Sequence, residues 1–173
     1  MRIISLTDFT PLAGTDWYQS VKNALAYLAA LGGGRLHVPK RPAHYTCNVA
    51  TAIPITSNDI TVELDAGAVL ENTSASGVDF FQFAGTAGTR NRINFRGGKI
   101  LSGGSAGHVF TFASGVGLGF ADWTSEIAQR NPAKSILIRA GSSRSGLFTH
   151  RLRGPHRTGA RLGFGCWQRF TVL

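Results

Sequence analysis

Two acidic side chains of this chain have the spacing that hydrolysis of a sugar bond requires. Glu63 and Asp65 stand two residues apart along a predicted strand that begins at Ile60, so both point to one face and lie about 6–7 Å apart. Glycosidases use two carboxyl groups separated by about 5–9.5 Å. Acids on an exposed strand face are more often simply solvated, and catalysis also needs a raised pKa on one partner. The pair therefore permits hydrolysis without establishing it.

Calcium binding is a second chemistry open to the same acids. Together with Glu71, Glu63 and Asp65 could supply some of the roughly six to eight oxygen ligands that calcium takes. No loop has the ligand spacing of a calcium site, and the five histidines do not have the spacing of a zinc site. We therefore expect no cofactor, with calcium as the alternative.

Basic and aromatic residues provide candidates for carbohydrate binding. Four basic residues gather between positions 90 and 99, and they either solvate a strand edge, which blocks aggregation, or contact an acidic glycan. These four are Arg90, Arg92, Arg96 and Lys99. Tyr and Trp rings can stack on sugars, although such rings more often pack in a core. The candidate substrate-binding set is Glu63, Asp65, Arg92, Arg96, Tyr45 and Trp123, and no catalytic residue is assigned.

The composition indicates a globular chain and limits its partners. Of the 173 residues, 43% are hydrophobic and 16% are charged, which argues against wholesale disorder. The net charge is +9, but residues 1–126 hold nine acids and nine bases, so the whole excess lies in residues 127–173. Nucleic acid is therefore not the expected partner, because the basic field is not protein-wide. No apolar run is long enough to cross a bilayer, and the N-terminus lacks a signal-peptide pattern.

The spacing of apolar residues predicts one helix followed by short strands. Trp17, Val21, Leu25 and Leu28 recur every three or four residues, which predicts an amphipathic helix over 15–31 that ends at a run of three glycines. Strands at 60–64, 68–71 and 80–83 are echoed at 92–95, 98–101 and 109–112, after 32, 30 and 29 residues. Segment 117–132 interrupts this rhythm, with a helical turn capped by Asp122. A repeat of about thirty residues with three short strands predicts one coil of a solenoid per set.

Residues 141–173 differ from the rest of the chain. Arg, Gly and Ser dominate there, no acid occurs, and both alternation and helical periodicity fail. Three interpretations stay open: a basic tail that binds an anion, an ordinary solvated terminus, and out-of-frame translation that begins near Ser142. We therefore divide the chain into residues 1–140, with the predicted helix and coils, and residues 141–173, an irregular basic tail.

The first 45 residues follow an ordered pattern. Its successive parts are Thr7-Asp8-Phe9, an Asp16 loop, an Ala-rich helix over 17–31, Gly32-Gly33-Gly34, a hydrophobic strand with Pro39, and Tyr45 in the closing loop. This order resembles the N-terminal signature of the pectate-lyase-like right-handed parallel β-helix superfamily, and the resemblance covers roughly residues 5–140. It implies an all-β fold, namely a right-handed parallel β-helix (solenoid) fragment with an N-terminal cap helix.

The resemblance also implies a function. Polysaccharide lyases, polygalacturonase-like hydrolases and phage tailspike depolymerases are similar at this end, and tailspikes are commonly homotrimers. We expect the N-terminal part of a tailspike or depolymerase that acts on or binds polysaccharide, with its catalytic coils outside this chain, so enzymatic activity is left open. Its location would be the virion or the extracellular space, and the cytoplasm until assembly or release. The alternatives are a non-catalytic attachment module of a phage or prophage tail, and anion binding through the basic tail.

Overall fold

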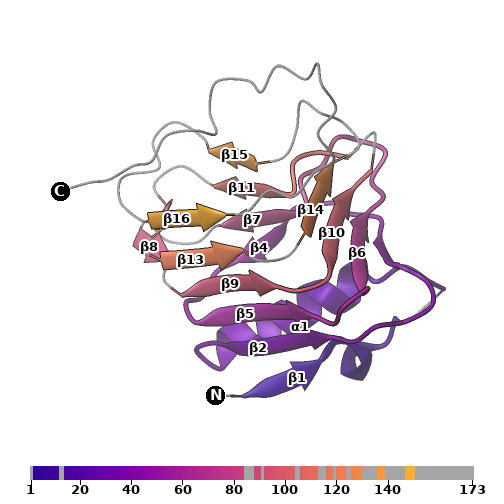
Figure 1. Cartoon of the computed structure of the whole chain (residues 1–173), viewed down its shortest axis with the longest axis horizontal. Coiled ribbons are helices and arrows are strands. Elements are labelled where there is room, and N and C mark those ends of the chain that lie inside the picture. The colour runs from indigo at the N-terminus through magenta and orange to yellow at the C-terminus, as the bar shows by residue number, and fades with distance from the viewer. Residues whose placement is uncertain are drawn as a thin grey trace.

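The computed structural model describes the backbone of most of the chain as far as His150 (Figure 1). The described residues are 2–11, 14–83, 88–90, 92–103, 106–112, 116–118, 120–123, 126–129, 136–138 and 147–150. Within them, side chains are described up to Thr111, those of 88–90 excepted. In these ranges no helix has both the length and the apolar character needed to span a membrane.

One α-helix, α1 (Tyr18–Ala30), follows a short 3₁₀ helix, η1 (Leu6–Phe9). Val21, Leu25 and Leu28 form its buried stripe, as their spacing predicts. Asp16 supports the first turn, because its Oδ1 accepts a hydrogen bond from the Tyr18 N–H at 3.0 Å. The predicted range of 15–31 is thus confirmed within three residues at the start and one at the end.

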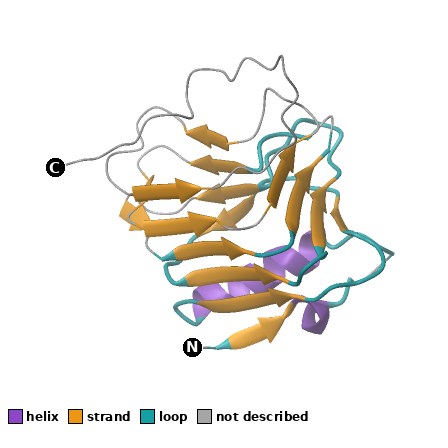
Figure 2. Ribbon diagram, viewed as in Figure 1, coloured by secondary structure: helices purple, strands orange, loops and turns teal. Residues whose placement is uncertain are grey.

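Short strands, all paired in parallel, make up most of the remaining structure (Figures 1 and 2). The six-stranded sheet contains, in spatial order, β1 (Ile3–Ser5), β2 (Gly34–Val38), β5 (Ile60–Leu64), β9 (Ile93–Arg96), β13 (Phe120–Trp123) and β16 (Leu147–His150). One four-stranded sheet contains β3 (Tyr45–Cys47), β6 (Val69–Asn72), β10 (Lys99–Ser102) and β14 (Glu126–Gln129). The other contains β4 (Ile53–Ile55), β7 (Phe81–Phe83), β11 (Phe110–Phe112) and β15 (Ile136–Ile138), and β8 (Gly88–Arg90) pairs with β12 (Val116–Leu118). Of the predicted tail at 141–173, β16 is the described part.

The three strand pairs that the repeat predicts all form. β5 pairs with β9 at an offset of 33 residues, one more than expected, while β6 pairs with β10 after 30 residues and β7 with β11 after 29. The expected helical turn at Asp122 is wrong, because this residue lies in β13 and pairs with Asn94 of β9. The rhythm of strands therefore continues through the segment that was expected to interrupt it.

The expected fold class, an all-β right-handed parallel β-helix fragment with a cap helix, is wrong. The described residues form small separate parallel sheets together with an α-helix, a mixed α/β arrangement in which no β-helix or solenoid is identified. Val21 and Leu28 of the helix belong to the same buried core as Leu36 and Ile55 of the strands. The helix is thus a layer of that core rather than a cover for an all-β body (Figure 2). Alternation predicts strand neighbours, but it does not predict how sheets and helix combine.

Phenylalanine rings from successive strands fill the core. The Phe81 ring centroid lies 4.3 Å from that of Phe80, 5.3 Å from that of Phe95 and 5.9 Å from that of Phe110. Phe95 and Phe110 meet edge to face at 4.8 Å. All four rings are buried, and such aromatic pairs contribute about 0.5–1.5 kcal/mol each beyond the area that they bury.

We expect Phe81→Ala to lower the free energy of unfolding by about 3–5 kcal/mol, because it leaves a cavity between three rings. Urea unfolding followed by circular dichroism measures this loss. Tyr27→Ala is the control: it removes a ring that is 43% exposed on α1, and it should cost about 1 kcal/mol or less. Equal losses from the two variants would contradict the packing described.

Candidate functional site

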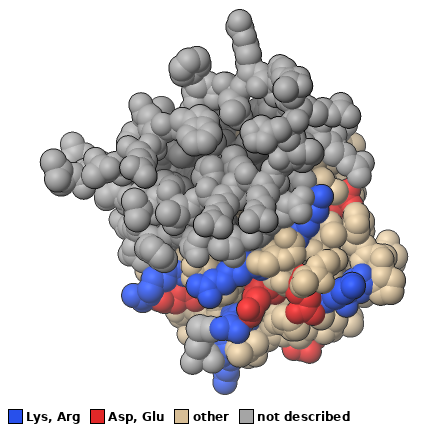
Figure 3. All heavy atoms as spheres, in the orientation of Figure 1, with Lys and Arg blue, Asp and Glu red and all other residues tan. Residues whose placement is uncertain are grey.

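Polar side chains on the outer face of the six-stranded sheet stand in rows across β2, β5 and β9. They alternate with buried apolar residues along each strand, so the register that packs the core also aligns them. Figure 3 shows basic and acidic side chains gathered on this face. The two rows are Arg35–Thr61–Asn94 and His37–Glu63–Arg96.

An open groove of about 570 Å³ lies where β2 and β5 begin, and along β9 it reaches from Arg92 to Arg96. Its volume is within the range of about 300–1,000 Å³ that is typical of small-molecule sites. Three guanidinium groups and one carboxylate line it, together with hydroxyl and amide groups, so its chemistry suits a polar and anionic ligand. The lining residues are Gly32, Gly33, Gly34, Arg35, Asp59, Thr61, Arg92, Asn94 and Arg96.

The turns that lead into the three strands share a left-handed residue. Gly33, Asp59 and Arg92 each precede the first residue of their strand, with φ of 124°, 58° and 57°. Gly33 must be glycine, since a Cβ there would lie 2.7 Å from the Asp59 Cβ. In the described part of the chain Asp59 and Arg92 are the non-glycine residues with positive φ, and such strain costs about 1–3 kcal/mol per residue. Backbone strain is thus concentrated at the rim of the groove.

Asp59 and Arg92 form a two-pronged ion pair across this rim. Arg92 Nε donates to Asp59 Oδ1, and Arg92 Nη2 donates to Asp59 Oδ2 at 2.7 Å. These hydrogen bonds lower the pKa of the Asp59 carboxyl and raise that of the Arg92 guanidinium. Both groups are therefore fully charged over the physiological range of pH.

Two polar atoms of the groove wall are left without partners. Within the described residues, Arg35 Nε and Asn94 Oδ1 are buried and make no hydrogen bond. The neighbouring atoms are engaged: Arg35 Nη1 donates to Glu63 Oε2 at 2.9 Å, and Asn94 Nδ2 donates to Thr61 Oγ1 at 3.4 Å. Arg96 is exposed and forms no ion pair with any described residue. Among the described residues of the wall, Arg96 is thus the exposed cation that is not committed to an ion pair.

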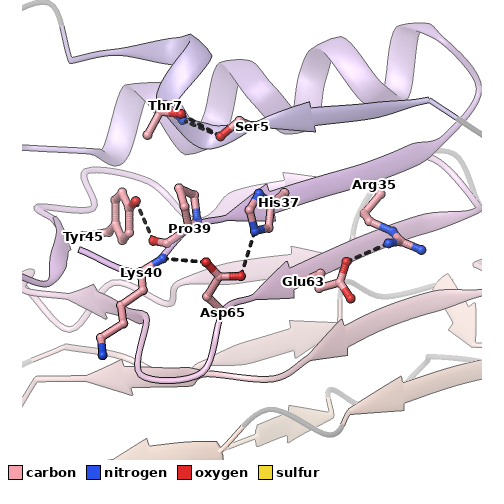
Figure 4. Close-up of polar contacts among 9 residues, drawn as sticks. All are labelled: Ser5, Thr7, Arg35, His37, Pro39, Lys40, Tyr45, Glu63 and Asp65. Atoms are coloured by element: carbon pink, nitrogen blue, oxygen red, sulfur yellow. Dashed lines mark hydrogen bonds and ion pairs between the residues drawn. The ribbon is translucent and has the colours of Figure 1, made fainter.

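Glu63 and Asp65, whose spacing permits hydrolysis without establishing it, are held by basic partners (Figure 4). Glu63 accepts from Arg35, while Asp65 Oδ1 lies 2.9 Å from His37 Nε2 and Asp65 Oδ2 accepts from the Lys40 N–H at 2.9 Å. The His37 hydrogen bond, followed by that from Lys40, lowers the pKa of Asp65. A general acid needs the opposite shift, so Asp65 does not suit that role, and Glu63 is engaged by the Arg35 guanidinium.

Of the two aromatic candidates, Tyr45 is buried and is not among the residues that line the groove. Tyr45 is 1% exposed, its hydroxyl donates to the Pro39 carbonyl at 2.8 Å, and Arg41 and Trp17 cover its ring. Burial raises its pKa, and the ring is not accessible to a sugar. Trp123 belongs to β13, but its side chain lies outside the described residues.

The structure divides the basic cluster that the sequence suggests. Arg92 and Arg96 line the groove, whereas Lys99 begins β10 in another sheet, and the Arg90 side chain lies outside the described part. Sequence reasoning missed Arg35 and Asn94, which come from β2 and β9. The only signal for them was the register, since the offset of the repeat aligns outer-face positions as well as inner ones.

The three acids considered for calcium do not come together. Glu71 lies on β6, in a different sheet from β5, and its Oε2 is 2.7 Å from His44 Nδ1. Among the described residues no group of three or more His, Cys, Asp or Glu could hold a metal ion. The expectation of no cofactor, with calcium as the alternative, stays a prediction.

We expect Asp65→Asn to lower stability at neutral pH, with an effect that fades in acid. The pKa of Asp65 lies below its usual 3.8 in the folded chain, so the carboxylate stabilises the fold above its unfolded-state pKa. This contribution is lost as the pH falls through the lowered folded-state pKa. Urea unfolding of both proteins at several values between about pH 7 and pH 2 measures it. A stability difference that does not change over this range would contradict a role for the charge.

Comparisons of the chain with protein-family models, with curated proteins and with solved structures find no match. The resemblance to the pectate-lyase-like superfamily therefore rests on the residues of the sequence pattern. The groove and its charges are the remaining guide to function.

Proposed function

We propose that this chain binds an anionic polysaccharide in the groove along β2, β5 and β9. The observation that carries the proposal is the convergence of Arg35, Arg92 and Arg96 on one open groove. One carboxylate, that of Asp59, opposes them, so the lining has two positive charges in excess. Guanidinium groups bind carboxylate and sulfate oxygens through paired, charge-assisted hydrogen bonds.

The polar groups between the arginines suit the hydroxyls of a sugar ring. A sugar hydroxyl both donates and accepts hydrogen bonds, and Arg35 and Asn94 of the lining carry donor and acceptor groups. The Thr61 hydroxyl lies between them in the same cross-strand row. An open groove also admits a chain that continues beyond the site.

Binding without bond cleavage fits the acids of this face better than hydrolysis does. Asp65 is held as a carboxylate by His37 and Lys40, and Glu63 accepts a hydrogen bond from Arg35. We assign no catalytic residue. The wider setting is proposed from the sequence pattern: the N-terminal part of a phage or prophage tailspike or depolymerase, a homotrimer found in the virion or outside the cell.

The charge of the ligand and the role of Arg96 can be tested with three forms of one polymer. Dextran, carboxymethyl dextran and dextran sulfate share a backbone and differ in charge. We expect the full chain to bind the two charged forms and not dextran itself. Arg96→Gln should weaken binding by about tenfold, the effect of one charge-assisted hydrogen bond, as measured by calorimetry.

Lys40→Gln is the matched control, because it removes one exposed positive charge beyond the other end of β2. It should leave the affinity within about twofold, as expected for a screened distant charge. Both variants keep the basic tail at 141–173. Equal losses in both variants, or no loss in Arg96→Gln, would assign the binding to diffuse charge or to the tail and overturn the proposal. Binding of neutral dextran with the same affinity would overturn its ionic part.

A further inference from the structure

We infer that Asp59 is an internal competitor for the groove's anionic ligand and thereby determines which ligands the groove accepts. This inference rests on the proposed function. The Asp59 carboxylate accepts the hydrogen bonds of the Arg92 guanidinium, so a ligand must displace this carboxylate before it can bind all three arginines of the groove. Weakly charged ligands are then rejected, whereas densely charged ones succeed.

The geometry of the pair supports competition. Arg92 donates through Nε and Nη2 to the two oxygens of Asp59, which is the arrangement that a ligand carboxylate or sulfate would also take. Both side chains line the groove. The Arg92 side chain is 68% exposed and that of Asp59 is 41% exposed. At such exposure a ligand carboxylate or sulfate can reach the Arg92 guanidinium and exchange with the Asp59 carboxylate.

The backbone conformation of Asp59 and Arg92 also supports competition. Before β2, the turn position that corresponds to Asp59 and Arg92 is occupied by Gly33, and glycine adopts a left-handed φ without strain. Asp59 and Arg92 adopt this conformation with side chains, which is strained for Arg in particular. The turns alone do not require these side chains. The two left-handed turns place a carboxylate and a guanidinium together at the rim of the groove, where a ligand would contact them.

The alternative is that the pair only fastens the two turns together. In that case, removing the Asp59 charge would lower stability and would not raise affinity. Competition predicts the opposite result for affinity, because neutralising Asp59 releases Arg92 and removes the one carboxylate from the groove lining. The two roles can therefore be separated by measuring binding and unfolding on the same variants.

The test is Asp59→Asn in the full chain, with dextran sulfate as the probe. Asn keeps the shape of Asp and tolerates a left-handed φ, so the turn is preserved. We expect affinity for dextran sulfate to rise on the order of tenfold at constant salt, with carboxymethyl dextran gaining at least as much. Asp65→Asn is the matched control: it removes a carboxylate at the other end of β5 that does not line the groove, and it should change affinity less than twofold.

A double-mutant cycle shows whether the gain depends on Arg92. If it does, Asp59→Asn should gain nothing in an Arg92→Gln background. A gain that persists in that background would reflect overall charge and overturn the inference, as would an Asp59→Asn variant whose affinity is unchanged or lower. Arg96→Gln distinguishes failure of the proposed function from failure of the inference. If Arg96→Gln weakens binding but Asp59→Asn does not strengthen it, binding in the groove is supported and only the competition by Asp59 is refuted. If Arg96→Gln has no effect, the proposed function fails first.

Discussion

The parallel register of β2, β5 and β9 is the constraint on which the rest of the structure depends. Leu36, Val62 and Phe95 stand opposite one another in this register, and all three are buried. Because side chains alternate along a strand, a slip of one residue would expose the apolar set and bury the charged one. The energy of packing therefore also determines the positions of the polar rows on the outer face. The groove is a consequence of the core.

The glycine turn between α1 and β2 connects this register to the helix. The Gly33 N–H donates to the Leu28 carbonyl, and the Gly34 N–H donates to the Asp59 carbonyl, both at 2.9 Å. A Cβ on Gly34 would lie 2.8 Å from both the Arg2 carbonyl oxygen and Leu28 Cδ2, so the helix, β1 and β2 meet there without space for a side chain. These N–H groups are used by the fold, so recognition of an anion in the groove depends on side chains.

Periodicity predicted the elements of this chain better than their combination. Repeating apolar residues identified α1 and three strand pairs, but the offset of β5 to β9 was one residue short because inner positions alone do not show how many residues a turn contains. The all-β class failed because the amphipathic helix packs as part of the core. Tyr45 was a candidate for sugar binding, yet the residue is buried and its hydroxyl donates to the Pro39 carbonyl, a contact that no spacing reveals. Arg35 and Asn94 line the same groove because the observed strand register aligns both with Thr61.

The groove differs from the other polar clusters of the chain in how completely its groups are paired. His37 pairs with Asp65, His44 with Glu71 and His108 with Asp79, at 2.9, 2.7 and 3.0 Å. In each of these pairs a side chain from one strand or loop meets a carboxylate 27–29 residues further along or back, and the contact joins neighbouring segments. Among the described residues, the groove instead combines buried atoms that make no hydrogen bond, an arginine outside any ion pair and two strained turns. Stability alone favours none of these features, so their occurrence together in one groove is the physical reason to place binding there.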